Sequence, residues 1–484
     1  MLAPWVSDEM ADVELKDKRL NNRLTEILSA LSAHPQSSIP AAHNGGEAET
    51  TAAYRFFDND RVGFEDILHP HIEASLRRFA EHAVVILVQD TSEIDLTRPE
   101  QQVIGAGTLD GHARHGVLLH PLMGFTPNGT PLGTVYAETW SRDDDEPRST
   151  AQKQYDRKHT PIEEKESLRW LDSHRDAVRV ADQIPDTQFI SVADSEADIY
   201  EVIDEAMQHS NLGWIVRACQ HRATLDEDDC NQSMQPRDVV MAEPVLFRQQ
   251  ITVRGRTAKV KIDKRARKQP REPRTAEVEV RAATVKLRAP WRSDRKLSHQ
   301  EVNVVVVSEV NPPDGDVAVE WILYTNLPIQ NAEEVREVIQ YYCVRWMIEI
   351  FFRTLKTGCR VESRRFEEVN RFYRCMAVYM IVAWRTLYVC RLGREMPDVS
   401  CEAVFGIDEW QSIWRVVNNE TPPKEPPKLQ EMVRLVARLG GYINRVRDDE
   451  PGPQSVAIGL QRLNDIVRCW RLFGPNANKE PTCV

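Results

Sequence analysis

The sequence has no apolar run long enough to cross a membrane. The longest such runs, at residues 83–88 and 376–384, are well short of the ~20 residues that a spanning helix needs. The N-terminal stretch MLAPWVSDEM is acidic, whereas a secretory signal would be basic and apolar. The sequence therefore predicts a cytoplasmic protein without membrane partners.

Paired cysteines are also missing. The nine cysteines are scattered from Cys219 to Cys483 without any C-x-x-C pair. This spacing disfavours a disulfide framework and a cysteine-type zinc site, so we expect reduced thiols. A chain of 484 residues exceeds one ordinary domain, and two to four units are expected.

A net positive charge is lacking too, although DNA-binding surfaces are usually basic. The formal net charge is -12, yet residues 254–296 contain sixteen Lys or Arg against five Asp or Glu. Such a run can be a solvated loop, as charge runs usually are. It fits a phosphate-binding surface better if a site for DNA chemistry lies elsewhere in the chain.

Helical and strand patterns divide the chain into three parts. Residues 1–80 have apolar positions at helical spacing and predict a small helical module. Residues 81–365 start with a buried-strand pattern and include a basic, β-rich insertion at 221–315, which interrupts the sheet pattern. Residues 366–484 are again helical and are expected to serve dimerisation or to contact a substrate.

Two predicted strands in the middle part each end on an aspartate. AVVILVQ leads to Asp90 and FISVA leads to Asp194, with a predicted hairpin at 117–125 and 131–140 and a helix between them. The order β-β-β-α-β-α-β is that of a ribonuclease H-like sheet, in which the first and fourth strands are neighbours. The predicted fold class is therefore α/β with a ribonuclease H-like mixed sheet, and Asp90 and Asp194 should lie side by side.

The stretch YYCVRWMIEIFFRTLK, residues 341–356, predicts a helix with a narrow polar line. At about 3.6 residues per turn the line covers an arc of about 80 degrees, opposite an apolar stripe. Its members are Tyr342, Arg345, Glu349, Arg353 and Lys356, and the stripe consists of Val344, Ile348, Phe351 and Leu355. Ion pairs at i,i+4 spacing on a solvated face are one explanation.

A metal site is the other explanation for the polar line. Glu349 would add a third carboxylate to Asp90 and Asp194, and oxygen ligands suit Mg²⁺ or Mn²⁺. Two such ions can clamp the attacking and leaving oxygens of an in-line displacement at a phosphodiester. On this interpretation the polar line faces a phosphate.

Several motifs occur together in a fixed order. Tyr342, Arg345, Glu349 and Lys356 form the pattern Y-x2-R-x3-E-x6-K without a gap, and they are accompanied by QDTSEIDL, ADSEADIY, KTGCRVESRRFEE and ARLGGY. In these motifs the sequence resembles the DDE transposases of bacterial insertion sequences, which are of the cut-and-paste type. The group that it resembles is the insertion-sequence-four group with its Y-R-E-K signature.

The resemblance implies roles for individual residues. Asp90, Asp194 and Glu349 would be the catalytic triad and would hold two Mg²⁺ or Mn²⁺ ions. Trp321 falls where the family has an aromatic that stacks on a flipped base, although an ordinary buried strand Trp is the alternative. The helical module resembles the family's end-recognition domain. The DNA-contact candidates besides Trp321 are Tyr342, Arg345, Lys356, Arg353, Arg217, Arg19 and Arg23.

The implied function is DNA transposition by metal-dependent phosphodiester hydrolysis at transposon ends, hairpin formation and strand transfer. The implied partners are double-stranded DNA with terminal inverted repeats, target DNA and a second copy in a homodimer, and the expected location is the cytoplasm, in association with the nucleoid. One alternative is a non-catalytic or domesticated relative that binds transposon ends, which the intact triad disfavours. Another is a structure-selective nuclease of the same fold, which would need no terminal repeats.

Overall fold

The computed structural model divides the chain into two compact units. One unit comprises Met1–His82, Thr91–Asp144 and Trp346–Val484, and the other comprises Ala83–Asp90 and Asp145–Arg345. The structure describes residues 4–43, 45–110, 113–143, 152, 155–156, 159–225, 234–253, 255, 271–445 and 448–475. Much of the basic run predicted at 254–296 therefore lies outside the described residues.

A mixed sheet forms the centre of the second unit. Among its described residues the strands lie in the order β1-β6-β7-β11-β10-β9-β8. β1, β6 and β7 are parallel, and each later neighbour is antiparallel. The bounds are β1 (Val84–Gln89), β6 (Gln188–Ala193), β7 (Leu212–Arg217), β8 (Phe247–Val253), β9 (Arg274–Leu287), β10 (Gln300–Glu309) and β11 (Glu320–Thr325).

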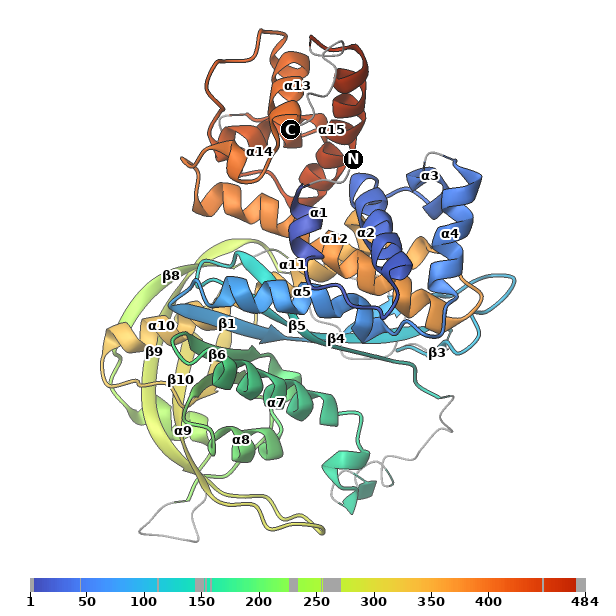
Figure 1. The fold of residues 1–484 in the computed structure, drawn as a ribbon. Coiled ribbons are helices and arrows are strands. Elements are labelled where there is room, and N and C mark those ends of the chain that lie inside the picture. The colour runs from blue at the N-terminus through green and yellow to red at the C-terminus, as the bar shows by residue number, and fades with distance from the viewer. Residues whose placement is uncertain are drawn as a thin grey trace. The chain divides into compact units, whose positions relative to one another are not determined.

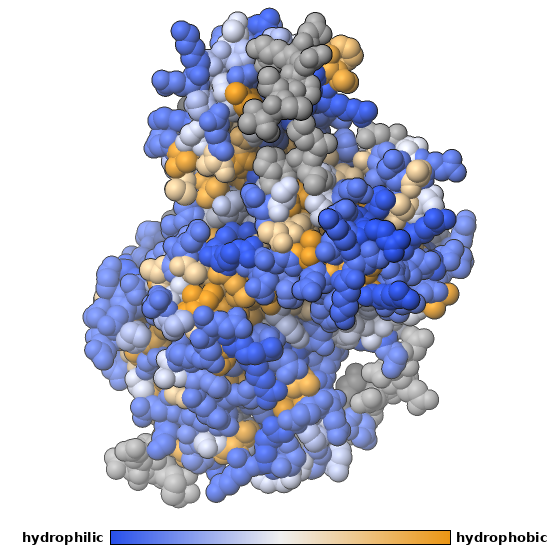
Figure 2. All heavy atoms as spheres, in the orientation of Figure 1, coloured by the Kyte–Doolittle hydropathy of each residue, from blue (hydrophilic) through white to orange (hydrophobic). Residues whose placement is uncertain are grey.

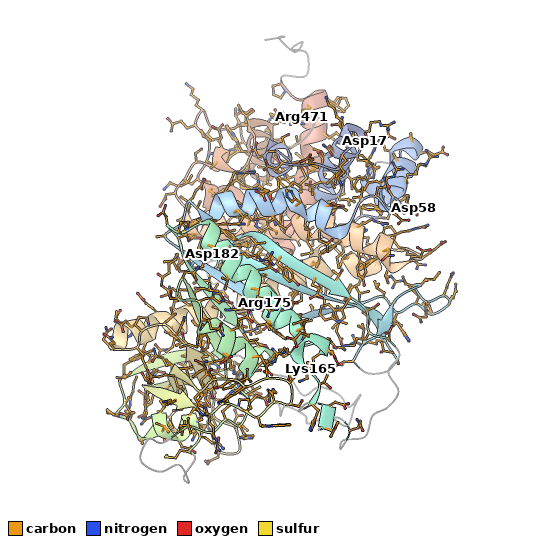
Figure 3. The ribbon with its side chains drawn as sticks, turned by 60° about the horizontal axis from the view of Figure 1, so that its bottom comes forward. Asp17, Asp58, Lys165, Arg175, Asp182 and Arg471 are labelled. Atoms are coloured by element: carbon orange, nitrogen blue, oxygen red, sulfur yellow. The ribbon has the colours of Figure 1, made fainter. Side chains whose placement is uncertain are left out.

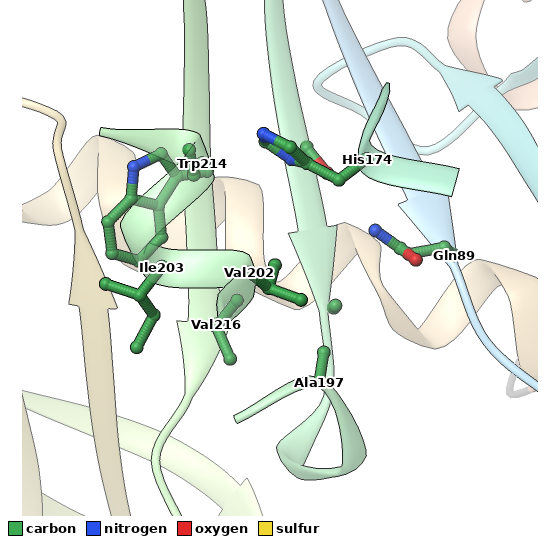
Figure 4. Close-up of a pocket in the computed structure, with 10 residues that line it drawn as sticks. Gln89, His174, Ala197, Val202, Ile203, Trp214 and Val216 are labelled. Carbon is green, nitrogen blue, oxygen red and sulfur yellow. The ribbon is translucent and has the colours of Figure 1, made fainter. Parts of the chain in front are cut away.

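Helices cover the parallel part of this sheet. α7 (Leu168–Gln183) and α10 (Ala332–Val344) pack against β1 and β6, and they lie on opposite faces of these strands (Figures 1 and 4). Side chains of β1 are therefore buried on both faces, which explains its continuous apolar sequence. The other helical elements of this unit are η1 (Ile162–Glu164), η2 (Ser195–Ala197), α8 (Tyr200–Ala206) and α9 (Pro236–Ala242).

The strands of the β-rich insertion predicted at 221–315 belong to the same sheet as β7 and β11. β11 pairs with β7 on one side and with β10 on the other, so β10, β9 and β8 extend the same sheet. The physical reason is that β11 offers backbone groups on both sides, and the valine-rich strand β10 satisfies the side away from β7. The strands within 221–315 therefore continue the sheet.

The first unit contains the predicted hairpin. β4 (His115–Phe125) and β5 (Pro131–Trp140) are antiparallel neighbours, which confirms the prediction for 117–125 and 131–140. β2 (Ser92–Asp95) and β3 (Gly107–Thr108) also pair with β4. Both β4 and the first half of β5 are buried, because helices of this unit pack against them.

Helices make up the rest of the first unit (Figure 1). Those before residue 80 are α1 (Pro4–Glu9), α2 (Lys18–Ala33), α3 (Ile39–Ala42), α4 (Glu47–Phe57) and α5 (Phe64–Phe79). Those after residue 345 are α11 (Trp346–Arg353), η3 (Thr354–Gly358), η4 (Val361–Ser363), α12 (Val369–Glu395), η5 (Cys401–Ala403), α13 (Ile407–Asn418), α14 (Leu429–Leu439) and α15 (Pro453–Phe473).

The long helix α12 is the core helix of the first unit. By length and composition it is the one helix in the described part of the chain that could cross a membrane, yet 78% of its most apolar window is buried. A core helix passes the same test, so this is weak evidence for a membrane span. The face of the protein seen in Figure 2 is mostly hydrophilic, with small scattered apolar patches over the described residues.

Candidate active site

Two aspartates follow neighbouring parallel strands in the second unit. β1 and β6 pair in the register Val88 with Val192, and Asp90 and Asp194 come two residues later on each strand. The carboxyl ends of parallel strands meet at the same end of a sheet. The prediction that these strands are adjacent is confirmed, and both aspartates are partly exposed there.

Different contacts hold the two carboxylates. Nη1 of Arg345 lies 3.3 Å from Oδ2 of Asp90, and the two side chains are only 13% and 14% exposed. The Asp194 carboxylate accepts a hydrogen bond of 2.8 Å from the Glu196 amide and so caps η2. Neighbouring carboxylates repel each other, and the guanidinium of Arg345 offsets that repulsion in this unit.

A third aspartate fixes the loops around this pair. The buried carboxylate of Asp198 accepts hydrogen bonds of 2.7 Å from the amides of Cys219 and Gln220 and one of 2.9 Å from Nε of Arg222. It thereby ties the segment after β7 to the turn that begins at Asp194. Asp198 was not among the predicted site residues, although an aspartate at each end of the short DSEAD segment could have indicated a capped turn.

Tyr342, Trp321 and Arg217 lie near Asp194 in the same unit. The Tyr342 side chain is only 6% exposed, and burial raises the pKa of its hydroxyl, with Arg345 and Arg217 opposing the rise and Asp194 adding to it. The rings of Trp321 and Tyr342 are 6.0 Å apart with a tilt of 58°. Trp321 is partly exposed at the start of β11.

A π-helical turn interrupts the predicted polar line before Lys356. α10 ends at Val344, α11 begins at Trp346, and α11 is followed by a π-helical turn at Thr354–Gly358. A π turn contains more residues than an α turn, so Lys356 leaves the line that 3.6 residues per turn predicts. The apolar stripe is confirmed, because Val344, Ile348, Phe351 and Leu355 are all buried.

The remaining members of the polar line belong to the first unit. Glu349 is partly exposed on α11, and Arg353 is exposed at the end of that helix. Lys356 lies among acidic side chains: burial lowers the pKa of its ammonium group, and Glu362, Glu93 and Asp95 oppose that change. Sequence analysis missed these acids, although Glu93 and Asp95 alternate along β2 and so share one face of the strand.

The N-terminal DNA-contact candidates carry acidic partners. Nη2 of Arg19 lies 2.9 Å from Oδ2 of Asp17, the residue that caps α2 and is labelled in Figure 3. Nη1 of Arg23 lies 2.8 Å from Oε2 of Glu26. These pairs are solvent-exposed and therefore weak, so a phosphate can compete with the carboxylates for either guanidinium.

The donor set fits a hard divalent cation only in part. Carboxylate oxygens are ligands that Mg²⁺ and Mn²⁺ prefer, and Asp90 and Asp194 supply them at adjacent strand ends. Among the described residues no three His, Cys, Asp or Glu side chains gather closely enough to hold a metal ion. The pair therefore matches such an ion in the chemistry of its oxygens, but two carboxylates alone do not make a complete site.

A small cavity lies beside the ends of β1 and β6 (Figure 4). Gln89 and Ala193, the residues before the two aspartates, line it together with His174 and Trp214. Nε2 of His174 and the indole nitrogen of Trp214 are buried without a hydrogen-bond partner. The volume open to the centre of a water molecule is about 10 Å³, which is room for about one water.

His174 should make the protein less stable in acid. Burial lowers the pKa of its imidazole from 6.5 to about 4. The unfolded chain therefore binds this proton more readily, and the free energy of unfolding should fall by about 1.4 kcal/mol per pH unit between pH 6.5 and 4. Thermal unfolding at pH 7 and pH 5 should show His174→Leu losing less stability on acidification than the wild type. An equal loss in both proteins would contradict this assignment.

A solved structure, the synaptic complex of piggyBac transposase with hairpin DNA, shows a distant likeness to this chain. The match covers 81% of this chain and 72% of the other, with a TM-score of 0.33 and 8% sequence identity. A TM-score at this level does not establish a common fold.

Three family models match successive parts of the chain. The Transposase DNA-binding model matches residues 2–62, the Transposase DDE domain model matches residues 174–384, and the Transposase Tn5 dimerisation domain model matches residues 381–475. The second of these ranges includes Asp194, Glu349 and the rest of the Y-R-E-K pattern. Successive parts of the chain are therefore similar to a transposase DNA-binding region, a transposase DDE domain and a Tn5-type dimerisation domain.

Proposed function

We propose that the protein is a cut-and-paste transposase of the insertion-sequence-four group with a ribonuclease H-like catalytic site. The observation that carries the proposal is the parallel pairing of β1 with β6, which brings Asp90 and Asp194 to adjacent strand ends. This pairing occurs in a chain that matches the Transposase DDE domain model. A pair of carboxylates next to an arginine is suited to phosphate chemistry.

In this proposal Asp90, Asp194 and Glu349 are the catalytic carboxylates. Glu349 follows Arg345 by four residues, about one helical turn, and Arg345 contacts Asp90 directly. Two Mg²⁺ or Mn²⁺ ions bound by these oxygens would supply Lewis-acid activation of the phosphodiester and of the attacking oxygen. The three carboxylates would hold the two ions at the reacting phosphate and offset their positive charge.

The basic and aromatic residues would hold the DNA. Arg345 can exchange part of its contact with Asp90 for a phosphate oxygen, and Arg217 and Tyr342 lie beside it. The partly exposed ring of Trp321 offers a stacking surface for an extruded base. Phosphate contacts farther along the DNA are proposed for Lys356, Arg353, Arg19 and Arg23.

The proposed reaction has four steps. Water attacks a phosphodiester at the transposon end, the bond to the 3′ oxygen breaks, and a 3′-hydroxyl and a 5′-phosphate are left. The freed 3′-hydroxyl then attacks the opposite strand, which forms a hairpin and releases the flanking DNA. A second water opens the hairpin and restores the 3′-hydroxyl, which finally attacks target DNA and displaces a 3′ oxygen there. The proposed substrates are terminal inverted repeats and target DNA. They would be bound by a homodimer that is associated with the nucleoid in the cytoplasm.

Cleavage of linear DNA that carries the gene's own flanking sequences tests this function. The wild-type protein should nick the element boundary and form a hairpin in Mg²⁺ or Mn²⁺, and EDTA should abolish both products. The control DNA has the same length and composition with scrambled flanks. Denaturing gels distinguish the nick from the hairpin, and a mobility-shift assay measures binding separately.

The alternatives give different products in the same assay. A non-catalytic or domesticated relative would bind the flanks without cleaving them in either metal. A structure-selective nuclease would cut both DNAs according to their shape and would ignore the scrambling. Either result would contradict the proposed transposition.

A further inference from the structure

The guanidinium of Arg364 is buried among backbone carbonyl groups in the first unit. The side chain is 5% exposed and follows η4. Its two terminal nitrogens donate hydrogen bonds to the carbonyl oxygens of Ser37, of Pro35 at 2.8 Å and of Cys359 at 2.6 Å. The guanidinium carbon also lies 4.6 Å from the centre of the Tyr379 ring, a favourable cation–π distance.

These three acceptors come from two parts of the chain with different roles. Pro35 and Ser37 lie between α2 and α3, within the range that matches the Transposase DNA-binding model. Cys359 follows the π turn after α11, and its amide donates to the Thr354 carbonyl at 2.8 Å. One side chain therefore connects the DNA-binding region to the end of the segment that carries Glu349 and Lys356.

The hydrogen bonds of Arg364 are suited to hold two segments of the chain in a fixed relative position. A planar guanidinium presents its donors in a fixed fork, whereas a lysine ammonium is a compact point charge that cannot match the same set of acceptors. Removing the fork would leave buried carbonyl oxygens without a donor, and an unsatisfied buried acceptor destabilises the folded state. The fork therefore holds the 35–37 loop and residue 359 in one relative position.

We propose that Arg364 is a positioning residue that couples the recognition of a DNA end to the placement of the Glu349 segment. The proposal rests on the proposed function, because it assigns Glu349 to the reaction. End DNA bound at the 2–62 region fixes the 35–37 loop, and Arg364 carries that constraint to Cys359. Without the fork, the protein should still bind end DNA but should cleave it more slowly.

Arg374 provides a matched control. This arginine of α12 is also buried, at 8% exposure, and it also binds the N-terminal region, with hydrogen bonds to the carbonyls of Val62 at 2.6 Å and Phe57 at 2.9 Å. Its contacts connect the N-terminal region to α12 and do not include Cys359. A loss of general stability should therefore appear in Arg374→Lys as well, whereas a selective loss of cleavage should not.

Single-turnover nicking at saturating end DNA tests the coupling. Arg364→Lys should bind end DNA within about threefold of the wild type, but it should nick the bound DNA about a hundredfold more slowly, because a displacement of about 1 Å can cost that much. Arg374→Lys should nick bound DNA at close to the wild-type rate, whatever it loses in thermal stability. A two-glycine insertion between Gln36 and Ser37 keeps Arg364, lengthens the loop, and should slow nicking in the same way.

The outcomes separate this proposal from the proposed function. No nicking by the wild type in Mg²⁺ or Mn²⁺ would contradict the function itself. Wild-type nicking together with unchanged nicking in the folded Arg364→Lys protein would overturn the coupling. If Arg364→Lys fails to fold, the glycine insertion decides: a wild-type rate at saturating DNA overturns the coupling. A slow rate in Arg374→Lys equal to that in Arg364→Lys would overturn it too, because both would then report general stability.

Discussion

Asp194→Asn should lower the rate of metal-dependent nicking by about a thousandfold or more while end-DNA binding stays close to wild type. The Asn side chain has nearly the same shape, and its oxygen can still accept from the Glu196 amide that Asp194 caps. The substitution therefore removes a charge and leaves the turn in place. Loss of about 4 kcal/mol of stabilisation of the reacting phosphate corresponds to three orders of magnitude in rate.

Glu196→Gln is the control for this substitution. Glu196 lies two residues away, is exposed, and pairs through its side chain with Arg169 at 3.3 Å. The substitution Glu196→Gln removes the same charge from the same turn, but from a side chain outside the pair of Asp90 and Asp194. Rates should be measured at saturating DNA and over a range of Mg²⁺ concentrations. Nicking by Asp194→Asn at the rate of Glu196→Gln would remove Asp194 from the catalytic set.

Glu349→Gln should have a comparable effect on nicking, and the double variant with Asp194→Asn should be hardly slower than either single variant. Groups that act as one unit in a reaction lose most of their joint effect when any one is removed. The matched control is Glu337→Gln, an exposed carboxylate on α10. Its rate should stay near that of the wild type, with thermal unfolding unchanged in all variants.

Additivity is the decisive readout for Glu349. If the two substitutions act at independent places, their effects on the logarithm of the rate should add. Fully additive losses, or wild-type nicking by Glu349→Gln, would show that this residue is outside the set formed with Asp194. The measurement depends on rates of bound complexes, so differences in DNA affinity do not enter it.

The strand ends were predictable because their signals are local. A continuous apolar run that stops at a carboxylate identifies β1 with Asp90 and β6 with Asp194, and the turn between 125 and 131 identifies the hairpin. The apolar stripe of residues 344–355 was predictable for the same reason. In each case a few neighbouring residues carry enough information to fix the structure.

The π turn after α11 was not predictable from the same pattern. Burial of Ile348, Phe351 and Leu355 is compatible with a straight helix and with one that contains an additional residue in a turn. The contact between Arg345 and Asp90 joins residues 255 positions apart, and periodicity carries no information about such a contact.

Arg364 shows a second limit of the sequence. It lies in the run RVESRRFEE, where alternating charges indicate an exposed segment, yet it is buried. Its acceptors are carbonyl groups of the backbone. Every residue has such a carbonyl, so the side chains near Ser37 and Cys359 give no sign of the contact.

The place of β11 between β7 and β10 has a consequence for shortened forms of the protein. If residues 221–315 were removed, β11 would become an edge strand, and its backbone amides and carbonyls on the β10 side would lose their partners. Open edges pair readily with strands of other chains and promote aggregation. Any shorter relative of this protein must therefore cover that edge with another strand, a helix or a charged side chain.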